Sequence, residues 1–493
     1  MRRSLLIGGV ALAVAVFLAV LLIRTVGLQA GEEPGEIPLP ALQLDSTAIL
    51  ERFAAALRYR TISHQDTAQV EHAEFERFHQ FLFQSFPEVH RQLEWERVGG
   101  YSLLYRWRGQ DTTAPAVLLM GHMDVVPVEP GTEKQWRYPP FAGVIAEGSV
   151  WGRGAIDDKI TVMGILEAAE ALLRAGFRPV RDVYFAFGHD EEVGGRRGAQ
   201  QIVALLKQRG VRLHWVLDEG GAVTVGMFPG VERPLAMVGI AEKGYMMVEL
   251  SAEGPGGHSS TPPRRSPLGL VAEAIAAVEH SPMPARLEGV AVEMLEAVAP
   301  EMPFWQRLLV ANRWLFGRFL LRQLQQTPRG NATVRTTFAP TIFQAGIKEN
   351  VIPSSARALV NVRLLPGDTP EAVVEHLQRR VPKGVKVRLQ GVLSLPSPVA
   401  DVRSEGFRLI RQVARSVFPE ARPVPYLVLG ATDARYYTVL TPNVFRFLPV
   451  RLTPEEYRTF HGTNERMPVG EILRAVRFYA GLLSAGAGTT SRP

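Results

Sequence analysis

The sequence predicts an α/β protein that contains a mainly parallel sheet, an inserted α+β domain and an N-terminal transmembrane helix. From about residue 100, short apolar runs alternate with helical patterns, which is typical of a parallel α/β layer. Near residue 242 the pattern changes to the alternation of antiparallel strands. The chain of 493 residues is 46% hydrophobic and 21% charged, which excludes the disordered and fibrous classes.

The first element is the unbroken apolar run at residues 5–23. Its length suits a bilayer core of about 30 Å at about 1.5 Å per residue. Arg2 and Arg3 precede the run, which favours a cytoplasmic N-terminus and a body on the non-cytoplasmic side. The alternative is a signal peptide that is cleaved from a secreted protein, but the run is longer than the usual signal core. We therefore predict a membrane anchor at 1–27 and an extended, proline-containing linker at 28–45.

The soluble body is expected to consist of a main domain in two parts, 46–241 and 394–485, separated by the insert at 242–393. The apolar spacing predicts helices at 46–59, 160–174, 198–209, 404–417 and 468–484. Buried strands are predicted at 116–120, 183–187 and 214–217, and strands of the insert at 245–250, 341–347 and 356–365. Residues 486–493 form a tail of small residues.

Charge and cysteine content narrow the function. The net charge is +6 and the basic residues are dispersed, so no nucleic-acid partner is expected. The chain has no cysteine, which excludes disulfides, cysteine-ligated zinc and thiol nucleophiles. A metal site would have to use His, Asp and Glu.

Such residues follow the predicted buried strands. His122 and Asp124 occur in GHMDVVP, and residues two apart on an extended strand point the same way. Asp124 is therefore placed to orient the ring of a metal-binding His122, although a structural hydrogen-bonded pair fits the motif equally well. Asp157, in WGRGAIDDK, is either a ligand or the cap of the following helix.

Further acids and a second histidine complete a candidate metal site. Glu191 and Glu192, in FGHDEEVGG, belong to a run of three acids that would repel one another without a cation or protons. Asp218 ends HWVLDEGG, and His461 lies in TFHGTNE. Two imidazoles and three carboxylates suit two zinc ions that share a bridging carboxylate, with Glu191 left as a free base: His122, Asp157, Glu192, Asp218 and His461.

These motifs, in this order and spacing, resemble the di-zinc aminoacylase/carboxypeptidase family. The similarity runs from about residue 46 to 484 and is greatest to the branch that contains carboxypeptidase S and the N-fatty-acyl-amino acid synthase/hydrolases. It implies a zinc-exopeptidase-like catalytic domain and a lid or dimerisation role for the insert, which allows a homodimer. It also implies that Asp157 bridges two zinc ions, with Glu192 and His461 on one and His122 and Asp218 on the other. Glu191 would be the general acid/base and Asp124 its supporting carboxylate.

The resemblance also implies residues that contact the substrate. His258, in EGPGGHSSTPP, matches a lid histidine that stabilises the oxyanion, often in the partner subunit; the alternative is a simple loop residue. Arg363, in VNVRLLP, matches the arginine that binds the free carboxylate of the substrate; the alternative is a salt bridge at a strand edge. Asn350, Gly430 and Thr432 match positions that line the pocket.

The expected activity is hydrolysis of the amide bond of N-acyl amino acids, with N-fatty-acyl ones included, or of C-terminal peptide bonds. One alternative is a dipeptidase or aminopeptidase of the same fold. Another is a membrane-tethered binding module without turnover, which predicts the loss of Glu191 or a ligand. Residues 302–324 are rich in Trp, Phe, Leu and Arg. They are interpreted either as an acyl pocket or interfacial helix, or as a buried lid or dimer core.

Overall fold

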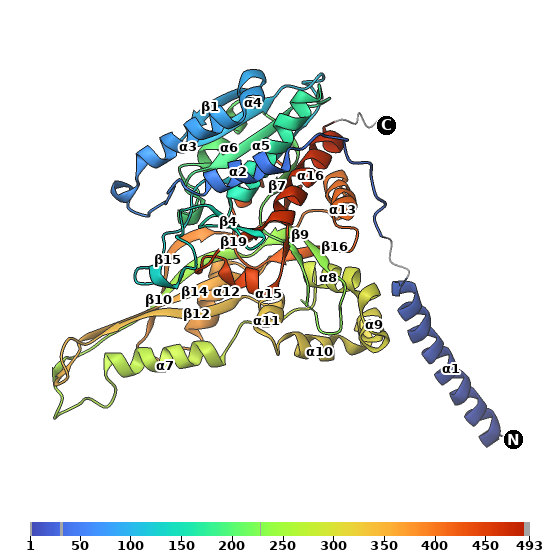
Figure 1. Cartoon of the computed structure of the whole chain (residues 1–493). Coiled ribbons are helices and arrows are strands. Elements are labelled where there is room, and N and C mark those ends of the chain that lie inside the picture. Colours follow the sequence, from blue (N-terminus) through green and yellow to red (C-terminus); the bar gives the residue numbers. More distant parts are fainter. Residues whose placement is uncertain (1, 30–32, 227, 488–493) are drawn as a thin grey trace.

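The computed structural model of the chain describes residues 2–29, 33–226 and 228–487. A ten-stranded sheet forms the centre of the body (Figure 1). Its strands, in spatial order, are β1 (Glu94–Val98), β2 (Ser102–Trp107), β6 (Val183–Gly188), β3 (Ala116–His122), β7 (Leu213–Asp218), β17 (Val444–Arg446), β9 (Leu235–Glu242), β8 (Val223–Thr224) and β18 (Arg451–Leu452), with β16 (Arg422–Val428) paired to β9.

This sheet is mixed, which corrects the prediction of a mainly parallel one. Strands β6, β3, β7 and β17 run parallel to one another, as expected. By contrast, β1 pairs with β2, and β2 with β6, in antiparallel orientation. Only residues 99–101 separate β1 from β2, and a connection that short joins antiparallel strands, whereas parallel strands need a long crossover.

Helices cover both faces of this sheet. Val117 and Leu119 of β3 belong to one apolar cluster, whereas Leu118 and Met120 belong to a second, because successive side chains of a strand point to opposite faces. On the first face lie α2 (Ser46–Ala56), α3 (His72–Ser85), α4 (Pro87–Gln92), α5 (Lys159–Arg174), α13 (Glu405–Val417) and α16 (Val469–Gly486). On the second lie α6 (Ala199–Gln208) and α14 (Ala434–Tyr437). The strands and helices expected in this part of the chain are confirmed.

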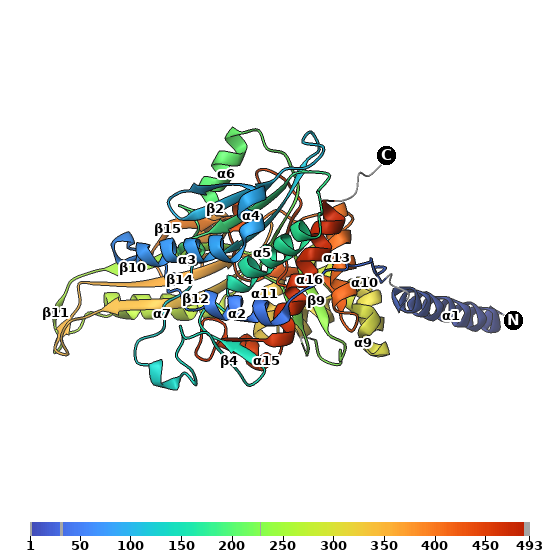
Figure 2. The same ribbon diagram turned by 45° about the horizontal axis from the view of Figure 1, so that its top comes forward.

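A second, antiparallel sheet lies beside the first. Its strands, in spatial order, are β12 (Thr337–Ala345), β14 (Ser355–Leu364), β10 (Gly244–Glu253) and β15 (Lys386–Ser394). Helices α7 (Pro267–His280) and α12 (Pro370–Gln378) bury its apolar face. At its outer end β11 (Gly257–His258) pairs with β13 (Val351–Ile352), at the left of Figure 2.

The helical part of the predicted insert packs elsewhere. Helices α8 (Val290–Val298), α9 (Phe304–Ala311), α10 (Arg313–Leu324) and α11 (Pro328–Val334) follow α7 in the chain. Met294, Val298 and Val310 of this group share an apolar cluster with Met237 of β9 and Val424 of β16. The stretch 290–324 therefore packs against β9 and β16 of the main sheet and not against the apolar face of the second sheet.

Short elements complete the fold. A three-stranded sheet consists of β19 (Arg466–Pro468), β5 (Ser149–Trp151) and β4 (Val144–Ala146). The remaining helix is α15 (Pro454–Thr459), and the 3₁₀ turns are η1 (Thr67–Gln69), η2 (Glu133–Gln135), η3 (Glu191–Val193) and η4 (Ala299–Glu301).

The N-terminal helix α1 (Arg2–Gln29) projects from the body (Figure 1). The most apolar 18-residue window within residues 6–29 has a mean hydropathy of 3.0, which makes α1 the one described helix long and apolar enough to cross a membrane; a signal sequence has the same properties. Residues 33–45 then run along the body without regular structure. Glu33 forms an ion pair with Arg422, and the backbone N–H of Ile37 donates to Ser416 Oγ at 2.9 Å. Most of the predicted tail, 488–493, lies outside the described residues.

Candidate metal centre and active site

His122 is the last residue of β3, and its ring has a fixed orientation. Nδ1 lies 2.9 Å from the backbone carbonyl oxygen of Asp124, to which it donates as N–H, and 3.4 Å from Asp124 Oδ1. Because Nδ1 carries a proton, Nε2 is the nitrogen that is free to bind a metal when the ring is neutral. Nε2 faces Asp157 Oδ1 at 2.8 Å. The sheet edge therefore presents a buried imidazole to a buried carboxylate.

Asp157 lies between two imidazoles. Its Oδ1 faces His122, and its Oδ2 lies 2.6 Å from Nε2 of His461, which comes from the loop after α15. The two histidines are separated by most of the catalytic chain, so the fold and not local sequence brings them together. One carboxylate with a different imidazole on each oxygen is the arrangement of a ligand that bridges two metal ions.

Two further carboxylates complete the cluster, one on each side. Glu192 Oε2 lies 3.4 Å from Nε2 of His461, and Glu219 Oε1 lies 3.5 Å from Nε2 of His122. Glu192 Oε1 is buried and has no hydrogen-bond partner in the described part of the chain. A buried carboxylate oxygen without a donor, next to imidazole nitrogens, fits a cation of the zinc type.

Of the two adjacent acids in LDEGG, Glu219 and not the predicted ligand Asp218 lies beside His122 in the described structure. Asp218 Oδ1 accepts the backbone N–H of Glu219 and Oδ2 accepts that of Ala434, both at 2.9 Å. Asp218 is the last residue of β7, and Glu219 follows it with its carboxylate 3.5 Å from Nε2 of His122. The pair of acids in LDEGG was the available signal, and the choice between them was not visible in the sequence.

Asp124 holds the acidic segment in position. Its Oδ1 accepts the backbone N–H of Glu191 at 3.1 Å, and its Oδ2 accepts that of Glu192 at 3.2 Å. Ser63 Oγ also donates to Oδ2, at 2.6 Å. The fully buried carboxylate of Asp124 therefore fixes the turn η3 that carries the two glutamates, while the backbone carbonyl of the same residue orients the ring of His122.

The carboxylates repel one another strongly. Burial, reinforced by the charges of Asp433 and Glu192, raises the pKa of Glu191 well above its usual range. Burial and the charge of Asp157 raise the pKa of Glu192 to about 8. Burial opposes the charged form of His461, but its hydrogen bonds to Asp157 and Glu192 outweigh this and raise its pKa to about 10. Such crowding of buried acids is relieved by a bound cation.

The predicted substrate-binding residues are more scattered. Arg363 of β14 stacks on the ring of Tyr245 at 4.6 Å, and within the described residues no carboxylate pairs with its guanidinium. Thr432 is buried, and its N–H and hydroxyl both donate to Glu242 at 3.0 Å. Gly430 lies two residues earlier in the same loop and is exposed.

His258 and Asn350 lie together at the far end of the second sheet, where β11 pairs with β13 (Figure 2). The backbone N–H of Ser259 donates to the carbonyl of Asn350 at 3.2 Å, and His258 is exposed. Within one chain the fold therefore does not bring these two residues to the metal cluster.

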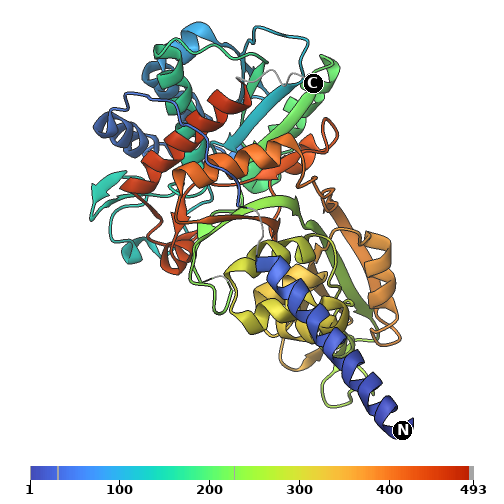
Figure 3. The same cartoon turned by 90° about the vertical axis from the view of Figure 1, so that its right-hand side faces the viewer.

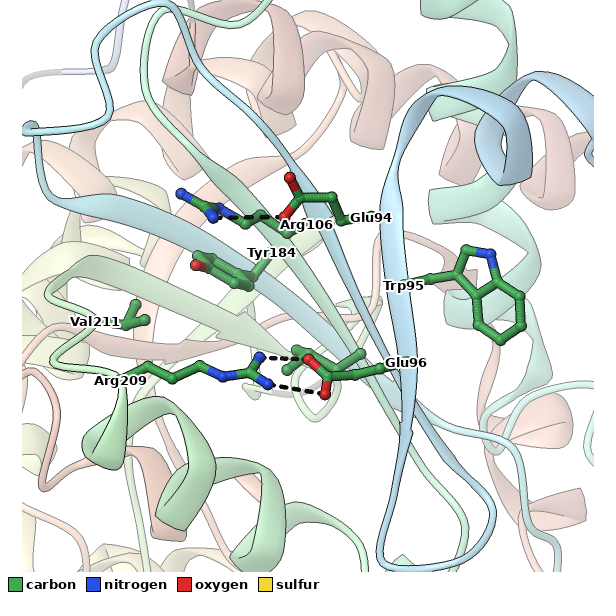
Figure 4. Close-up of a pocket in the computed structure, with 8 residues that line it drawn as sticks. Glu94, Trp95, Glu96, Arg106, Tyr184, Arg209 and Val211 are labelled. Carbon is green, nitrogen blue, oxygen red and sulfur yellow. Dashed lines mark hydrogen bonds and ion pairs between the residues drawn. The ribbon is translucent and has the colours of Figure 1, made fainter.

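A separate hollow of about 400 Å³ lies at the other edge of the main sheet, over β1, β2 and β6 and beside the loop that follows α6 (Figure 4). Its charged groups pair with one another: Arg106 with Glu94 at 3.4 Å, and Arg209 with Glu96. It contains none of the predicted site residues, so it is no candidate for the active site.

Residues 118–485 match the family described as peptidase family M20/M25/M40. The chain belongs to this family. It is 37% identical to the probable carboxypeptidase S-like 2 of Dictyostelium discoideum, over 98% of this chain and 92% of the relative. It is 36% identical to the human N-fatty-acyl-amino acid synthase/hydrolase PM20D1, over 95% of this chain and 94% of the relative.

The fold is also that of the M20 metallo-carboxypeptidase Sso-CP2 from Sulfolobus solfataricus, with a TM-score of 0.66 and 19% identity over 88% of this chain and 98% of that one. The resemblance drawn from the motifs is thus confirmed. The M20 protein is a hydrolase of the metallopeptidase class, and its cluster of imidazoles and carboxylates is a metal-binding group.

Proposed function

We propose that this M20 enzyme is a di-zinc amidase that hydrolyses N-acyl amino acids, N-fatty-acyl ones included, or C-terminal peptide bonds. The observation that carries the proposal is Asp157, whose two oxygens face His122 and His461 separately. The names of the relatives, which include carboxypeptidases and N-fatty-acyl-amino acid hydrolases, support the substrate class.

The ligands divide into two sets around the shared Asp157. His461 and Glu192 would hold one ion, and His122 and Glu219 the other. Two zinc ions, when bound, polarise a scissile carbonyl and lower the pKa of a water molecule. The proposed ligand is Glu219 instead of Asp218, because both oxygens of Asp218 accept hydrogen bonds from backbone N–H groups.

Glu191 is the proposed general base. Its backbone is fixed by Asp124, and its side chain comes from the same turn as the ligand Glu192. The raised pKa of Glu191 suits a group that takes a proton from the attacking water and then gives it to the leaving nitrogen.

Arg363 is the proposed partner of the substrate carboxylate. Its guanidinium lies over the ring of Tyr245, and a planar fork of donors matches a carboxylate. Asn350 and His258 would come from a second copy of the chain, which their place at the end of the second sheet supports. In that arrangement the second sheet is the lid and dimerisation unit. Gly430 and Thr432 would shape the pocket wall.

The helix α1 is the proposed membrane anchor, with the body on the non-cytoplasmic side. Arg2 and Arg3 before the apolar run support this orientation. Cleavage of α1 as a signal peptide, which would release the body, is the alternative.

The test is a hydrolysis screen of zinc-loaded protein. The substrates are acetyl amino acids, long-acyl amino acids, dipeptides with a free carboxylate, and dipeptides with an amidated C-terminus. The proposal requires turnover of free acids and not of the amidated peptides. Cleavage of amidated dipeptides through their free amine would identify an aminopeptidase, and no turnover with two zinc ions bound would identify a binding module.

The variant Glu191→Gln should lose more than about a thousand-fold in kcat while retaining both metal ions, because it removes the proton acceptor and no ligand. The matched control is Glu129→Gln, at an exposed glutamate in a loop, which should keep full activity. Normal turnover by Glu191→Gln would refute the role of the base.

A further inference from the structure

Helices α9 and α10 make direct contact with α1. Asn312, between the two helices, is fully buried, and its Nδ2 donates to the backbone carbonyl of Leu21 at 3.2 Å. The ring of Trp314 meets that of Phe17 edge-on, with centroids 6.1 Å apart. Figure 3 shows α1 crossing in front of the yellow helices of this region. The one apolar helix of membrane-spanning length therefore packs on residues 304–324.

The outer face of these helices is apolar and uncovered. None of the residues of α10 is buried. The exposed fractions are 73% for Trp305, 55% for Trp314 and 48% for Phe319, and Phe304 and Leu315 are also exposed. We define these five residues as the aromatic face. In a water-facing helix such side chains would be costly to leave uncovered.

Cations lie beside the aromatic face. Arg318 and Arg322 are exposed and lie one turn apart on α10, near Leu315 and Phe319 in helical spacing. Neither arginine forms an ion pair with a residue that the structure describes. Trp, Phe and Leu next to unpaired Arg is the composition of a helix that lies in a membrane interface among phosphate headgroups.

The level at which Trp314 contacts α1 gives the depth of α10 in a bilayer. The apolar run ends before Arg24, where the hydrocarbon region of a bilayer would end. Phe17 lies seven residues earlier, so the ring of Trp314 would lie roughly 10 Å below that level at about 1.5 Å per residue. Interfacial helices bury their apolar face by about 5–10 Å, which agrees with this depth.

We propose that α9 and α10 form a second membrane contact, with the aromatic face embedded in the lipid leaflet next to the body and Arg318 and Arg322 at the phosphates. This inference rests on the proposed anchor for the level of the membrane. The rest of the body lies on one side of this contact, since α1 projects away from it (Figure 1). The chain is thereby held to the bilayer at two points and in one orientation.

The absence of cysteine makes the test direct, because any introduced cysteine is unique. Full-length protein is placed in vesicles of phosphatidylcholine with a minority of phosphatidylserine. An environment-sensitive fluorophore is attached to Phe319→Cys and, separately, to Trp305→Cys. Val10→Cys in α1 is the reference for lipid, and Val439→Cys, in an exposed loop of the body, is the reference for water. Quenching by nitroxide lipids and by iodide is measured for each.

The proposal expects the ratio of lipid to iodide quenching at Phe319→Cys and Trp305→Cys to resemble that at Val10→Cys and to exceed that at Val439→Cys severalfold. Iodide quenching at both positions with Val10→Cys in lipid would overturn the second contact and leave the anchor standing. Iodide quenching at Phe319→Cys, Trp305→Cys and Val10→Cys would overturn both the second contact and the membrane anchor. Protection from both quenchers would mark a second copy as the cover and also overturn the proposal. Lipid quenching at both positions with Val10→Cys in water would support the contact and refute the anchor.

Discussion

The proposal that Glu219 and not Asp218 is a metal ligand can be tested by comparing two conservative variants, Glu219→Gln and Asp218→Asn. Each replaces one carboxylate by an amide of the same shape. Glu219 Oε1 lies 3.5 Å from Nε2 of His122, whereas the oxygens of Asp218 bond only to the backbone N–H groups of Glu219 and Ala434 and to nearby side chains. The first change should therefore act on metal affinity and the second on folding.

The two variants are expected to change different quantities, namely metal affinity and the free energy of unfolding. Groups that merely support a ligand contribute about 10–100-fold to metal affinity, so the loss of a direct ligand should cost at least about 100-fold for one of the two ions. A hundred-fold change corresponds to about 2.7 kcal/mol. In Asp218→Asn the new amide NH₂ faces one backbone N–H, which leaves a buried donor unpaired and costs about 1–3 kcal/mol of unfolding free energy.

Zinc binding is measured by competition with a chelator and the bound ions are counted by elemental analysis. Unfolding in urea is measured after metal removal, so that the two effects stay separate. Glu219→Gln should retain one tightly bound ion at near-normal stability, and Asp218→Asn should retain two at reduced stability. If Asp218→Asn loses an ion and Glu219→Gln keeps both, the assignment of Glu219 is wrong.

Two more predictions concern the substrate and the pH dependence of folding. Arg363→Lys keeps the charge but loses the planar fork, so kcat/KM should fall about tenfold or more for free acids and little for the corresponding amides; an equal loss for both would count against carboxylate binding. His79 is buried and its Nε2–H donates to the carbonyl of Tyr101 at 3.0 Å, while burial lowers its pKa to about 4. Between about pH 6.5 and 4 the unfolded chain takes up a proton that the folded chain does not, so the stabilisation present above pH 6.5 decreases with falling pH by up to about 1.4 kcal/mol per unit. His79→Phe should flatten this slope relative to the parent protein in urea unfolding at several pH values, and identical slopes would contradict the assignment.

The sequence predicted the parallel centre of the main sheet well, because strands buried on both faces are continuous apolar runs. The acids and histidine at the ends of β3, β6 and β7 could then be placed together by topology alone. The sequence did not show which of Asp218 and Glu219 lies beside His122, because the direction of each side chain depends on the backbone where β7 ends. The mixed edges depend on short hairpins whose strands, such as β1, are polar and carry little apolar signal.

Long-range packing was beyond the sequence. Residues 302–324 show a strong apolar pattern, and both a pocket and an interface agreed with it. The hydrogen bond from Asn312 to Leu21, which joins positions 291 residues apart, and the contact between Trp314 and Phe17 distinguish a helix pair beside α1 from a wall of the active site. Periodicity predicts that a face is apolar and does not predict what covers it.

The segment 33–45 has a consequence for symmetry. Glu33 pairs with arginines of the body, Ile37 bonds to Ser416, and Leu39 packs against Gly481, so the body holds the chain from the fourth residue after the end of α1 onward. A body fixed in this way to α1 cannot change its orientation relative to the membrane while α1 stays in a bilayer. Two copies in one membrane then face the same way, and a closed pair of them has a two-fold axis perpendicular to the membrane plane. Only surfaces on the flanks of the body, not its top or base, are able to meet in such a pair.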